Sequence, residues 1–437
     1  MSMRLRTALL CALASTLLAT SATAVETALQ QAVAADYPHL QSLFEHLHAH
    51  PELSLQEVET AKRLAAELKP LGFTVTTGVA TTGVVALLRN GIGPTLLIRA
   101  DMDALPVQEK TGLPYASTRR QVNLKGEEMP VMHACGHDMH ITTLVGVARR
   151  MAALKDHWQG TLMLVGQPAE EAIGGARLMV ADGLYQRFGR PDFALALHVI
   201  AKHPAGKIAF SEGLMYSSAD TVAITVRTKA THGAAPHLGN DPIVIGSQIV
   251  LALQNIVTRE ISPIEPALIT VGAFHGGSAP NVISDQARLD ITVRANSEPT
   301  RKKLLESIRR VALNTARAAG VSEALLPLVE VEAGGAPTTN NDPALARRVR
   351  AAMLAGMGAD AFTPWAQTDM GAEDFPDLVG VDPPIPSVYF EVGGTPPALI
   401  ASGHWAEHHS PLFQIAPEPA IKAGVEAMTL AALDLLR

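Results

Sequence analysis

Short apolar segments of strand length alternate with helical segments over the first half of the chain, and this alternation constrains the fold most strongly. The apolar runs are Val84–Leu88, Thr95–Ala100, Thr161–Gly166 and Phe193–Leu197. Ala61–Leu68 and His140–Leu154 space their apolar residues as helices do. Parallel strands need crossover connections, and the helices that make them cover both faces of the sheet. We therefore predict an α/β domain whose sheet is mostly parallel, with helices on both faces.

Three of these runs end just before acidic or imidazole side chains. The residues are Asp101 and Asp103 after the second run, Glu170 and Glu171 after the third, and His198 after the fourth. In open α/β sheets, ligands bind outside the carboxyl ends of the strands. The strands thus deliver groups that can bind a metal or move a proton to one edge of the sheet, and we predict the functional site there.

The first residues of the chain, Met1–Ala24, have the layout of a secretory signal peptide. Arg4 and Arg6 give a positive start, Ala8–Leu18 an apolar middle, and Ala22–Ala24 an A-x-A cleavage site. The apolar run is shorter than the roughly 20 residues that a membrane-spanning helix needs. We therefore expect the protein to be exported to the periplasm, or secreted, and to leave the membrane once the signal is cleaved.

Cys135 is then the only cysteine of the mature chain, because Cys11 lies inside the signal segment. A single thiol cannot form an intrachain disulfide, although an oxidising compartment favours paired cysteines. His137 follows two residues later, and Gly136 between them lets the backbone turn tightly so that both side chains reach a common centre. We interpret Cys135 and His137 as ligands of a metal site.

Further acidic and imidazole groups are available for a second metal. Two divalent cations that share a hydroxide can polarise a carbonyl, and such a centre needs about five or six protein ligands. Of the adjacent Glu170 and Glu171, one can bind metal while the other stays free as a general base. His198 adds an imidazole, and either His408 or His409 adds another. Thiolate with imidazole suits zinc, and carboxylates also suit manganese, with cobalt or nickel as alternatives.

The pattern changes near Ser211. Asp241 and Pro242 are typical of the N-cap and first position of a helix. The elements predicted in this region are the strands Thr221–Arg227, Ala267–Phe274 and Ala287–Ala295 and the helices Asp241–Arg259 and Thr300–Ala319. This βαββα order predicts a second, α+β domain inserted into the first, whose pattern resumes with a helix at Pro343–Met353.

Four segments resemble the binuclear-metal N-acyl-amino-acid amidohydrolases. That family includes hippurate hydrolases, aminoacylase-like enzymes and plant auxin-conjugate hydrolases, and it belongs to a metallopeptidase clan with carboxypeptidases. The segments are Arg99–Pro106 (RADMDALP), His133–His140 (HACGHDMH), Pro168–Glu171 (PAEE) and Thr231–His237 (THGAAPH). The resemblance runs from about His48 to Pro411, which is nearly the whole mature chain.

The resemblance implies a role for each matching residue of the first domain. Cys135 would bridge two divalent metal ions in each chain. The other metal ligands would be His137, Glu171, His198 and His409. Glu170 would be the catalytic general base, and Asp103 would be a carboxylate behind the ligands.

Three further residues match positions in the inserted domain of the family. His232 would stabilise the oxyanion of the tetrahedral intermediate, and Asn281 and Arg294 would hold the substrate carboxylate. The resemblance also implies a homodimer formed through this domain. We assign 1–24 to the signal peptide, 25–212 and 328–437 to the catalytic metal-binding domain, and 213–327 to an inserted lid or dimerisation domain.

The expected reaction is hydrolysis of the amide bond of an N-acyl amino acid by a metal-bridging hydroxide. Hippurate-like and N-acetyl amino acids are the expected substrates, with short peptides also considered. A dipeptidase or carboxypeptidase of the same clan, and a non-catalytic metal- or peptide-binding relative, are the alternatives. The net charge of −7 and the lack of a Lys/Arg block argue against a nucleic-acid partner.

Overall fold

The computed structural model describes residues 28–437, so the predicted signal segment lies outside the described residues. The chain divides into two compact units. The first comprises the chain up to Gly213 together with Asn341–Ala366 and Leu378–Arg437, and the second comprises Leu214–Asn340 and Gln367–Asp377. The second change of unit therefore comes after Asn340 rather than at the 327/328 boundary proposed from the sequence, and nothing in the sequence pattern marks the return at Gln367–Asp377.

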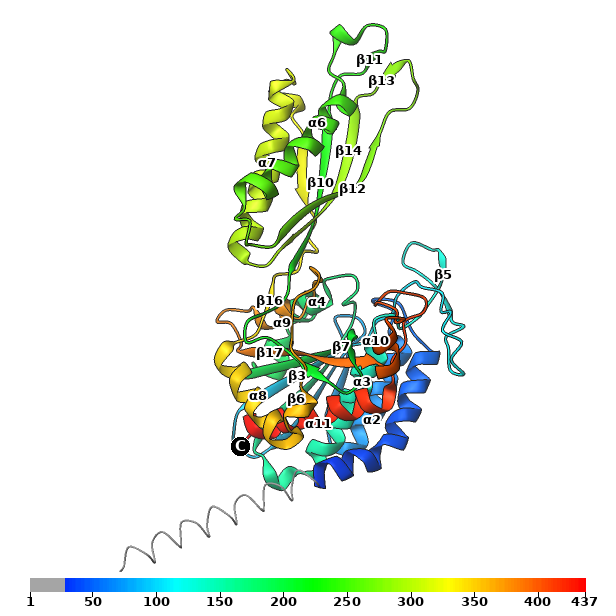
Figure 1. Ribbon diagram of the computed structural model, residues 1–437, viewed down its shortest axis with the longest axis vertical. Helices are drawn as coiled ribbons and strands as arrows, with labels where there is room; N and C mark the ends of the chain where they lie inside the picture. The colour runs from blue at the N-terminus through cyan, green and yellow to red at the C-terminus, as the bar shows by residue number, and fades with distance from the viewer. Residues whose placement is uncertain (1–27) are drawn as a thin grey trace, which may run out of the picture. The chain divides into compact units, whose positions relative to one another are not determined.

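A seven-stranded sheet in the order β1-β2-β6-β3-β7-β17-β8 forms the centre of the first unit (Figure 1). The strands are β1 (Thr74–Val79), β2 (Gly83–Asn90), β6 (Gly160–Gln167), β3 (Thr95–Asp101), β7 (Phe193–Pro204), β17 (Ser387–Thr395) and β8 (Ile208–Ala209). The four strands from β6 to β17 are parallel to one another. Because β1 is antiparallel to β2 and β2 to β6, only β2 and β8 run against the rest, and the mostly parallel sheet is confirmed.

Helices cover both faces of this sheet. They include residues 28–49, α2 (Val58–Leu68), α3 (His137–Ala153), α4 (Gly175–Ala181), α5 (Leu184–Phe188), α8 (Pro343–Met357), α10 (Pro397–Ser402) and α11 (Pro417–Leu435). In Figure 1, α8 and α11 lie below the sheet and α4 lies above it. The strand β3 is buried at every position from Leu96 to Asp101, as a central parallel strand covered on both faces must be.

The second unit contains a four-stranded antiparallel sheet in the order β12-β14-β10-β15. Its main elements are β10 (Ser218–Arg227), α6 (Pro242–Asn255), β12 (Ala267–Gly276), β14 (Gln286–Ala295), α7 (Glu298–Ala318) and β15 (Leu328–Val331). Asp241 caps α6, because its side chain accepts the N–H groups of Ile243 and Val244. The short edge strand β15 adds to the predicted βαββα order, and α6 ends at Asn255, before a π-helical turn at Ile256–Glu260.

The core of the second unit explains why its strands alternate. Val222, Ile224 and Val226 on β10 are fully buried in one apolar cluster, to which α6 and α7 contribute Ile249 and Leu304. Each strand therefore turns every second side chain toward the helices.

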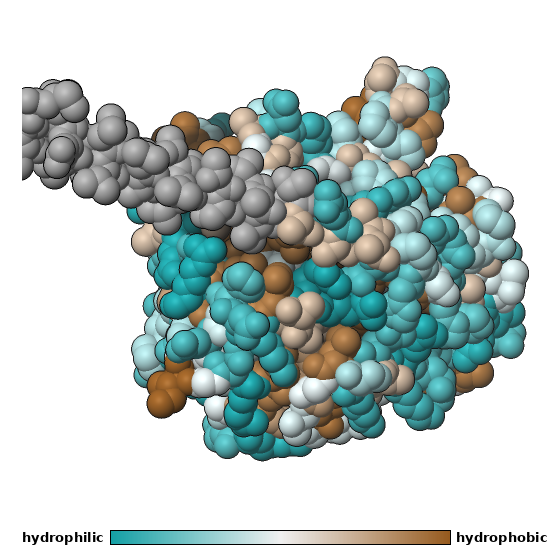
Figure 2. Space-filling model, turned by 90° about the horizontal axis from the view of Figure 1, so that it is seen from below, coloured by the Kyte–Doolittle hydropathy of each residue, from teal (hydrophilic) through white to brown (hydrophobic). Residues whose placement is uncertain are grey.

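In residues 28–437, no helix is both long and apolar enough to cross a membrane. The face of the molecule in Figure 2 is mainly hydrophilic, and hydrophobic residues are scattered over it. Scattered apolar residues are ordinary on a protein surface and mark no site by themselves.

Candidate metal centre

Strand ends and loops of the first unit bring the predicted metal ligands together at the carboxyl edge of the sheet. β3 ends at Asp101, and β6 ends at Gln167, just before the Glu170–Glu171 pair. His198 was expected at a strand end, but β7 continues to Pro204. The strand β3 pairs with β7 only as far as Ala196, so the next part of β7 is free of that neighbour and the His198 imidazole reaches Cys135.

The Cys135–His137 turn is tightly built around its glycine. Gly136 has a left-handed φ of 83° and directly precedes α3. A Cβ at this position would lie 2.3 Å from Cγ1 of Val199, so only glycine fits both the backbone conformation and the space. This turn places Cys135 and His137 side by side at the start of a buried helix.

Cys135 belongs to two groups of potential metal ligands. One group consists of Cys135, His137 and His198, and the other of Cys135, Glu171 and His409, with the ligand atoms of each group within 4.8 Å of one another. The Cys135 Sγ lies 3.5 Å from Nε2 of His198, and the His409 Nε2 lies 3.5 Å from Oε2 of Glu171. A thiolate shared by two such groups is the arrangement that a bridging ligand requires.

Hydrogen bonds orient two of the imidazoles toward this centre. The Nδ1 of His137 donates to the Asp103 carbonyl oxygen at 2.8 Å, and the Nδ1 of His198 donates to the Val199 carbonyl oxygen at 2.6 Å. Both Nε2 atoms are then lone-pair donors, as metal-ligating histidines held by backbone carbonyls are. The Nε2 of His137 is buried and has no hydrogen-bond partner, so the residues fit a metal ion at this atom.

The electrostatics of the centre are those of a cation site. Burial and the nearby Glu171, Glu170 and Asp101 carboxylates raise the pKa of the Cys135 thiol well above its usual range. Burial likewise raises the pKa of Glu171 to about 7. A divalent cation reverses both effects, because it stabilises the thiolate and the carboxylate.

Asp101 and His140 lie next to the ligands but are occupied by other contacts. The Nη1 of Arg99 lies 2.6 Å from Oδ2 of Asp101, and the Nδ1 of His140 donates to Oδ1 of Asp101 at 2.5 Å. The Val199 N–H donates to Nε2 of His140 at 2.8 Å. Both imidazole nitrogens of His140 are thus used, and this buried network supports the predicted ligands from behind.

The turn that carries Glu170 and Glu171 is anchored by Asp103. The N–H groups of Glu170 and Glu171 donate to Oδ1 and Oδ2 of Asp103, each at 3.0 Å. The Oε2 of Glu170 lies 3.9 Å from Nε2 of His137. Glu170 shares a potential ligand group with His137 and Glu171, but it is absent from both groups that contain Cys135. Its role as the free base stays a prediction.

The two adjacent histidines near the C-terminus have different environments. His408 is buried, its Nε2 donates to the Val199 carbonyl oxygen at 2.9 Å, and its ring lies against Phe413. His409 adopts a left-handed φ of 64°, and its N–H donates to the Ala134 carbonyl oxygen at 2.8 Å, which ties its loop to the Cys135 turn. The geometry therefore favours His409 as the ligand.

The three candidate residues of the second unit do not gather at one place within it. His232 lies on β11 (Thr231–His232), which pairs with β13 (Val282–Ile283), and the Gly233 N–H donates to the Asn281 carbonyl oxygen. Arg294 lies near the other end of β14, where it pairs with Ala219. Along β14 the distance from Gln286 to Arg294 is roughly 26 Å at about 3.3 Å per residue. The length of β14 therefore separates Arg294 from the end of the unit that carries Asn281 and His232, and their role in holding a substrate carboxylate stays a prediction.

Comparison with known proteins identifies the family. The model of peptidase family M20/M25/M40 matches residues 97–434. The chain belongs to this family. It is 39% identical over 284 residues to the hippurate hydrolase of Campylobacter jejuni, covering 64% of this chain and 71% of that protein. It is 35% identical over 351 residues to thermostable carboxypeptidase 1 of Saccharolobus solfataricus, covering 79% and 84%.

A solved structure of the same family has the same fold. It is a dinuclear metal binding peptidase of the M20 family from Bacillus subtilis, with a TM-score of 0.74 and 29% identity, covering 92% of this chain and 99% of that one. The family and fold class predicted from the sequence are confirmed, and this M20-family protein is a metal-dependent amidohydrolase.

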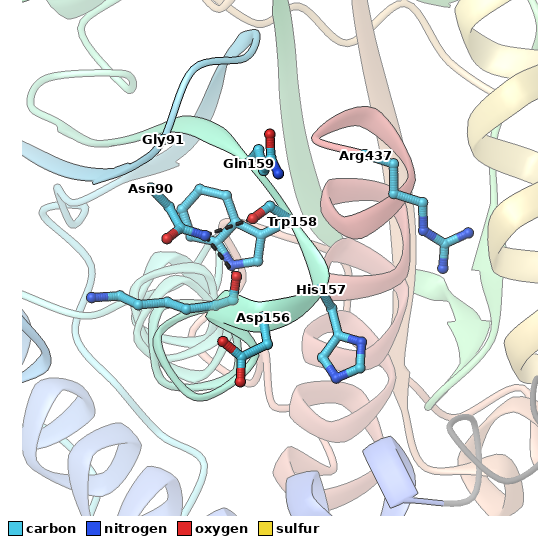
Figure 3. Close-up of a pocket in the computed structure, with 8 residues that line it drawn as sticks. Asn90, Gly91, Asp156, His157, Trp158, Gln159 and Arg437 are labelled. Carbon is cyan, nitrogen blue, oxygen red and sulfur yellow. Dashed lines mark hydrogen bonds between the residues drawn. The ribbon is translucent and has the colours of Figure 1, made fainter.

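A separate pocket of about 680 Å³ lies at the opposite edge of the sheet of this M20-family enzyme (Figure 3). Asn90, which donates hydrogen bonds to the Lys155 and Trp158 carbonyl oxygens, pairs with Gly160 at the beginning of β6. The pocket therefore opens at the amino ends of the parallel strands. The predicted metal ligands lie at the carboxyl ends, so this pocket is separate from the candidate metal centre.

Two buried residues without a role assigned from the sequence support the centre. His48 lies between two carboxylates, 2.7 Å from Oδ2 of Asp138 and 3.1 Å from Oε1 of Glu109. Glu57 accepts the N–H of Ala169, directly before Glu170. Both residues precede β3, the first strand that ends at a candidate site residue. No local sequence pattern links them to partners roughly a hundred positions later, so only the folded chain shows these contacts.

Proposed function

We propose that this enzyme hydrolyses the amide bond of N-acyl amino acids and releases a carboxylic acid and a free amino acid. The observation that carries the proposal is the sharing of Cys135 by two ligand groups, with the Glu170 carboxylate beside them. Hippurate-like and N-acetyl amino acids are the proposed substrates. The relatives support this class, since they include a hippurate hydrolase and an N-acetyl-L-cysteine deacetylase.

The proposed cofactor is a pair of divalent metal ions in each chain. The proposed metal is zinc or manganese, with cobalt or nickel as alternatives, because the donor set mixes thiolate, imidazole and carboxylate. The residues that would hold them are Cys135, His137, Glu171, His198 and His409. When bound, such ions would polarise the scissile carbonyl and lower the pKa of a bound water.

Glu170 is the proposed general base. Its carboxylate takes the proton of the attacking water and then returns it to the leaving amine. Asp103 holds the backbone of Glu170 and Glu171 together, so the base and the neighbouring ligand keep a constant spacing. Burial of the pair excludes bulk water and strengthens these interactions.

The second unit would supply the remaining polar groups. His232 is solvent-exposed, with its Nδ1 accepting the N–H of Ala234 at 2.9 Å, which leaves Nε2 to donate to the developing oxyanion. Arg294 suits a bidentate contact with a substrate carboxylate. Since Asn281 and Arg294 lie at opposite ends of the unit, we propose a homodimer through this unit, in which the two chains complete each other's sites. Light scattering in solution tests the dimer.

A carboxypeptidase or dipeptidase activity is the second candidate, favoured by the similarity to a thermostable carboxypeptidase. Both candidates use the same centre, so an assay must separate them. Purified protein is analysed for metal and incubated with hippurate, N-acetyl amino acids, dipeptides and blocked peptides, with and without chelator. Chelator-sensitive release from the acylated amino acids supports the first activity. Cleavage of peptides alone supports the second, and full metal loading without hydrolysis supports a binding protein.

Export to the periplasm, or secretion, remains part of the proposal. It rests on the sequence of Met1–Ala24 alone. Mass spectrometry of the protein from the extracytoplasmic fraction should give a chain that begins near Val25. A chain that keeps Met1–Ala24 in the cytoplasm would contradict it.

A further inference from the structure

Three successive backbone N–H groups hold the turn that carries Glu170. Those of Glu170 and Glu171 donate to the two carboxylate oxygens of Asp103. That of Ala169 donates to Oε1 of Glu57 at 2.8 Å. Two carboxylates from distant parts of the chain thus share the anchoring of one turn, and the sequence motifs point only to Asp103.

The backbone at Ala169 needs such an anchor. Ala169 has a left-handed φ of 53°, a conformation that a residue with a Cβ adopts only when its surroundings hold it there. Its side chain is buried, and its carbonyl oxygen accepts the N–H of Gly175 at 3.2 Å. Since Ala169 directly precedes Glu170, a rotation of this peptide would move the Glu170 carboxylate.

Glu57 is an unusual group to find in this position. It is fully buried, and its carboxylate accepts the N–H groups of Ala169 and Leu55 and the Thr82 hydroxyl. Within residues 28–437 its partners are these neutral donors and its own backbone N–H, and no basic side chain contacts it. A buried carboxylate without a cation costs folding free energy, which points to a role for its hydrogen bonds beyond stability.

We propose that Glu57 is a positioning residue for the hydrolytic reaction, which fixes the Ala169 peptide and thereby aims the Glu170 carboxylate. This inference rests on the proposed function, because it takes Glu170 as the base. It predicts that Glu57 affects turnover without binding metal or substrate itself.

Glu52 provides a matched control. It is also a buried carboxylate of the same segment, and it accepts the N–H and hydroxyl of Thr60 at 2.8 and 2.9 Å and the N–H of Glu59 at 3.2 Å. These donors lie at the start of α2, and none of them belongs to the Glu170 turn. Loss of Glu52 therefore disturbs the same region of the fold without releasing Ala169.

The test compares Glu57→Leu, Glu57→Gln and Glu52→Leu in the full-length mature enzyme. In Glu57→Leu, kcat should fall about 30- to 100-fold, since a misplacement of about 1 Å costs on the order of 100-fold. KM and metal content should stay within about twofold of the wild type, because no ligand is changed. Glu57→Gln should restore kcat to within about threefold, since its amide oxygen accepts the same N–H groups and its amide nitrogen donates to the Thr82 hydroxyl. Glu52→Leu should lower the melting temperature but leave kcat within about threefold of the wild type.

Hydrogen exchange over residues 168–176 provides a readout that does not depend on activity. Glu57→Leu should speed exchange of this segment, whereas Glu52→Leu should not. If the wild type hydrolyses none of the substrates, the proposed function fails, and the exchange data still decide whether Glu57 holds the turn. Unchanged exchange, or equal losses of kcat in both leucine variants, would overturn the positioning role. If Glu57→Leu does not fold, Glu57→Asp, which withdraws the acceptor by one methylene, replaces it with the same expectations.

Discussion

The Cys135 turn of the first unit and the Thr231–His237 loop of the second both resemble segments of the same family, but the two are built in different ways. Cys135 is 8% exposed and His137 is fully buried, and each sits among side chains and backbone groups that fix its orientation. His232 is exposed on a two-stranded ribbon whose contacts are mainly backbone hydrogen bonds. The predicted metal-binding part is therefore preorganised inside one unit, whereas the second unit presents His232 on its surface.

This contrast predicts separate consequences for substitutions in the two regions. Changes near Cys135 should alter metal binding and stability together, because ligands and core share the same contacts. Changes at His232 should alter turnover alone.

Glu170→Gln should lower kcat by about 1,000- to 10,000-fold, because it removes the proposed base while it keeps the shape of the side chain. Metal content should remain that of the wild type, measured by elemental analysis of the purified protein. Residual turnover near the wild-type rate would show that Glu170 is not the base. Loss of metal would show instead that Glu170 is a ligand.

Cys135→Ala should weaken metal binding by more than about 100-fold, since even loss of a supporting partner of a ligand costs about 10- to 100-fold. Because the site is buried, the melting temperature of the metal-loaded protein should also fall. Titration with zinc or manganese under competition with a chelator measures the affinity. Wild-type metal affinity in this variant would contradict the bridging role.

His232→Ala should lower kcat by about 100-fold, as expected for loss of one oxyanion donor. Its metal content and melting temperature should match the wild type, because the side chain is exposed. His237→Ala, an exposed histidine of the same loop, is the control and should keep wild-type turnover. A fall in metal content with His232→Ala would break the separation between the two regions.

His48→Gln should change the melting temperature more than turnover, and the size of that change should depend on pH. Burial lowers the pKa of His48, but hydrogen bonds to Asp138 and Glu109 outweigh it and raise the pKa to about 10. The ring also lies against Tyr115 and Phe44, and burial raises the pKa of Tyr115 to about 12, which keeps that residue neutral.

Because the pKa is raised on folding, the charged His48 stabilises the fold fully below the unfolded value of about 6.5. This stabilisation is lost as the pH rises through about 10. The difference in melting temperature between wild type and His48→Gln should therefore be largest below about pH 6.5 and shrink toward pH 10. A difference that does not change with pH would show that the imidazole is neutral in the folded protein.

The alternation of strand-length and helical patterns was enough to predict the first unit, because a strand that is buried on both faces is a continuous apolar run in the sequence. The edge strands β1 and β8 were not predicted because neither is a long apolar run: β1 is partly exposed, and β8 has only two residues. In the second unit the period-two pattern of β10 predicted its strand, while the end of α6 was placed four residues too late, at Arg259 rather than Asn255. Helical spacing continues through the π-helical turn, so periodicity does not mark the boundary.

The candidate site divides in the same way. Local order alone determined that carboxylates follow β3 and β6, and that one glycine joins Cys135 to His137, since both depend only on neighbouring residues. Tertiary structure decided that His409 rather than His408 faces Glu171, that Asn281 and Arg294 lie far apart, and that Glu57 holds Ala169. Hydrogen bonds between groups far apart in the chain depend on how strands and loops pack. The spacing of residues in the sequence does not determine that packing.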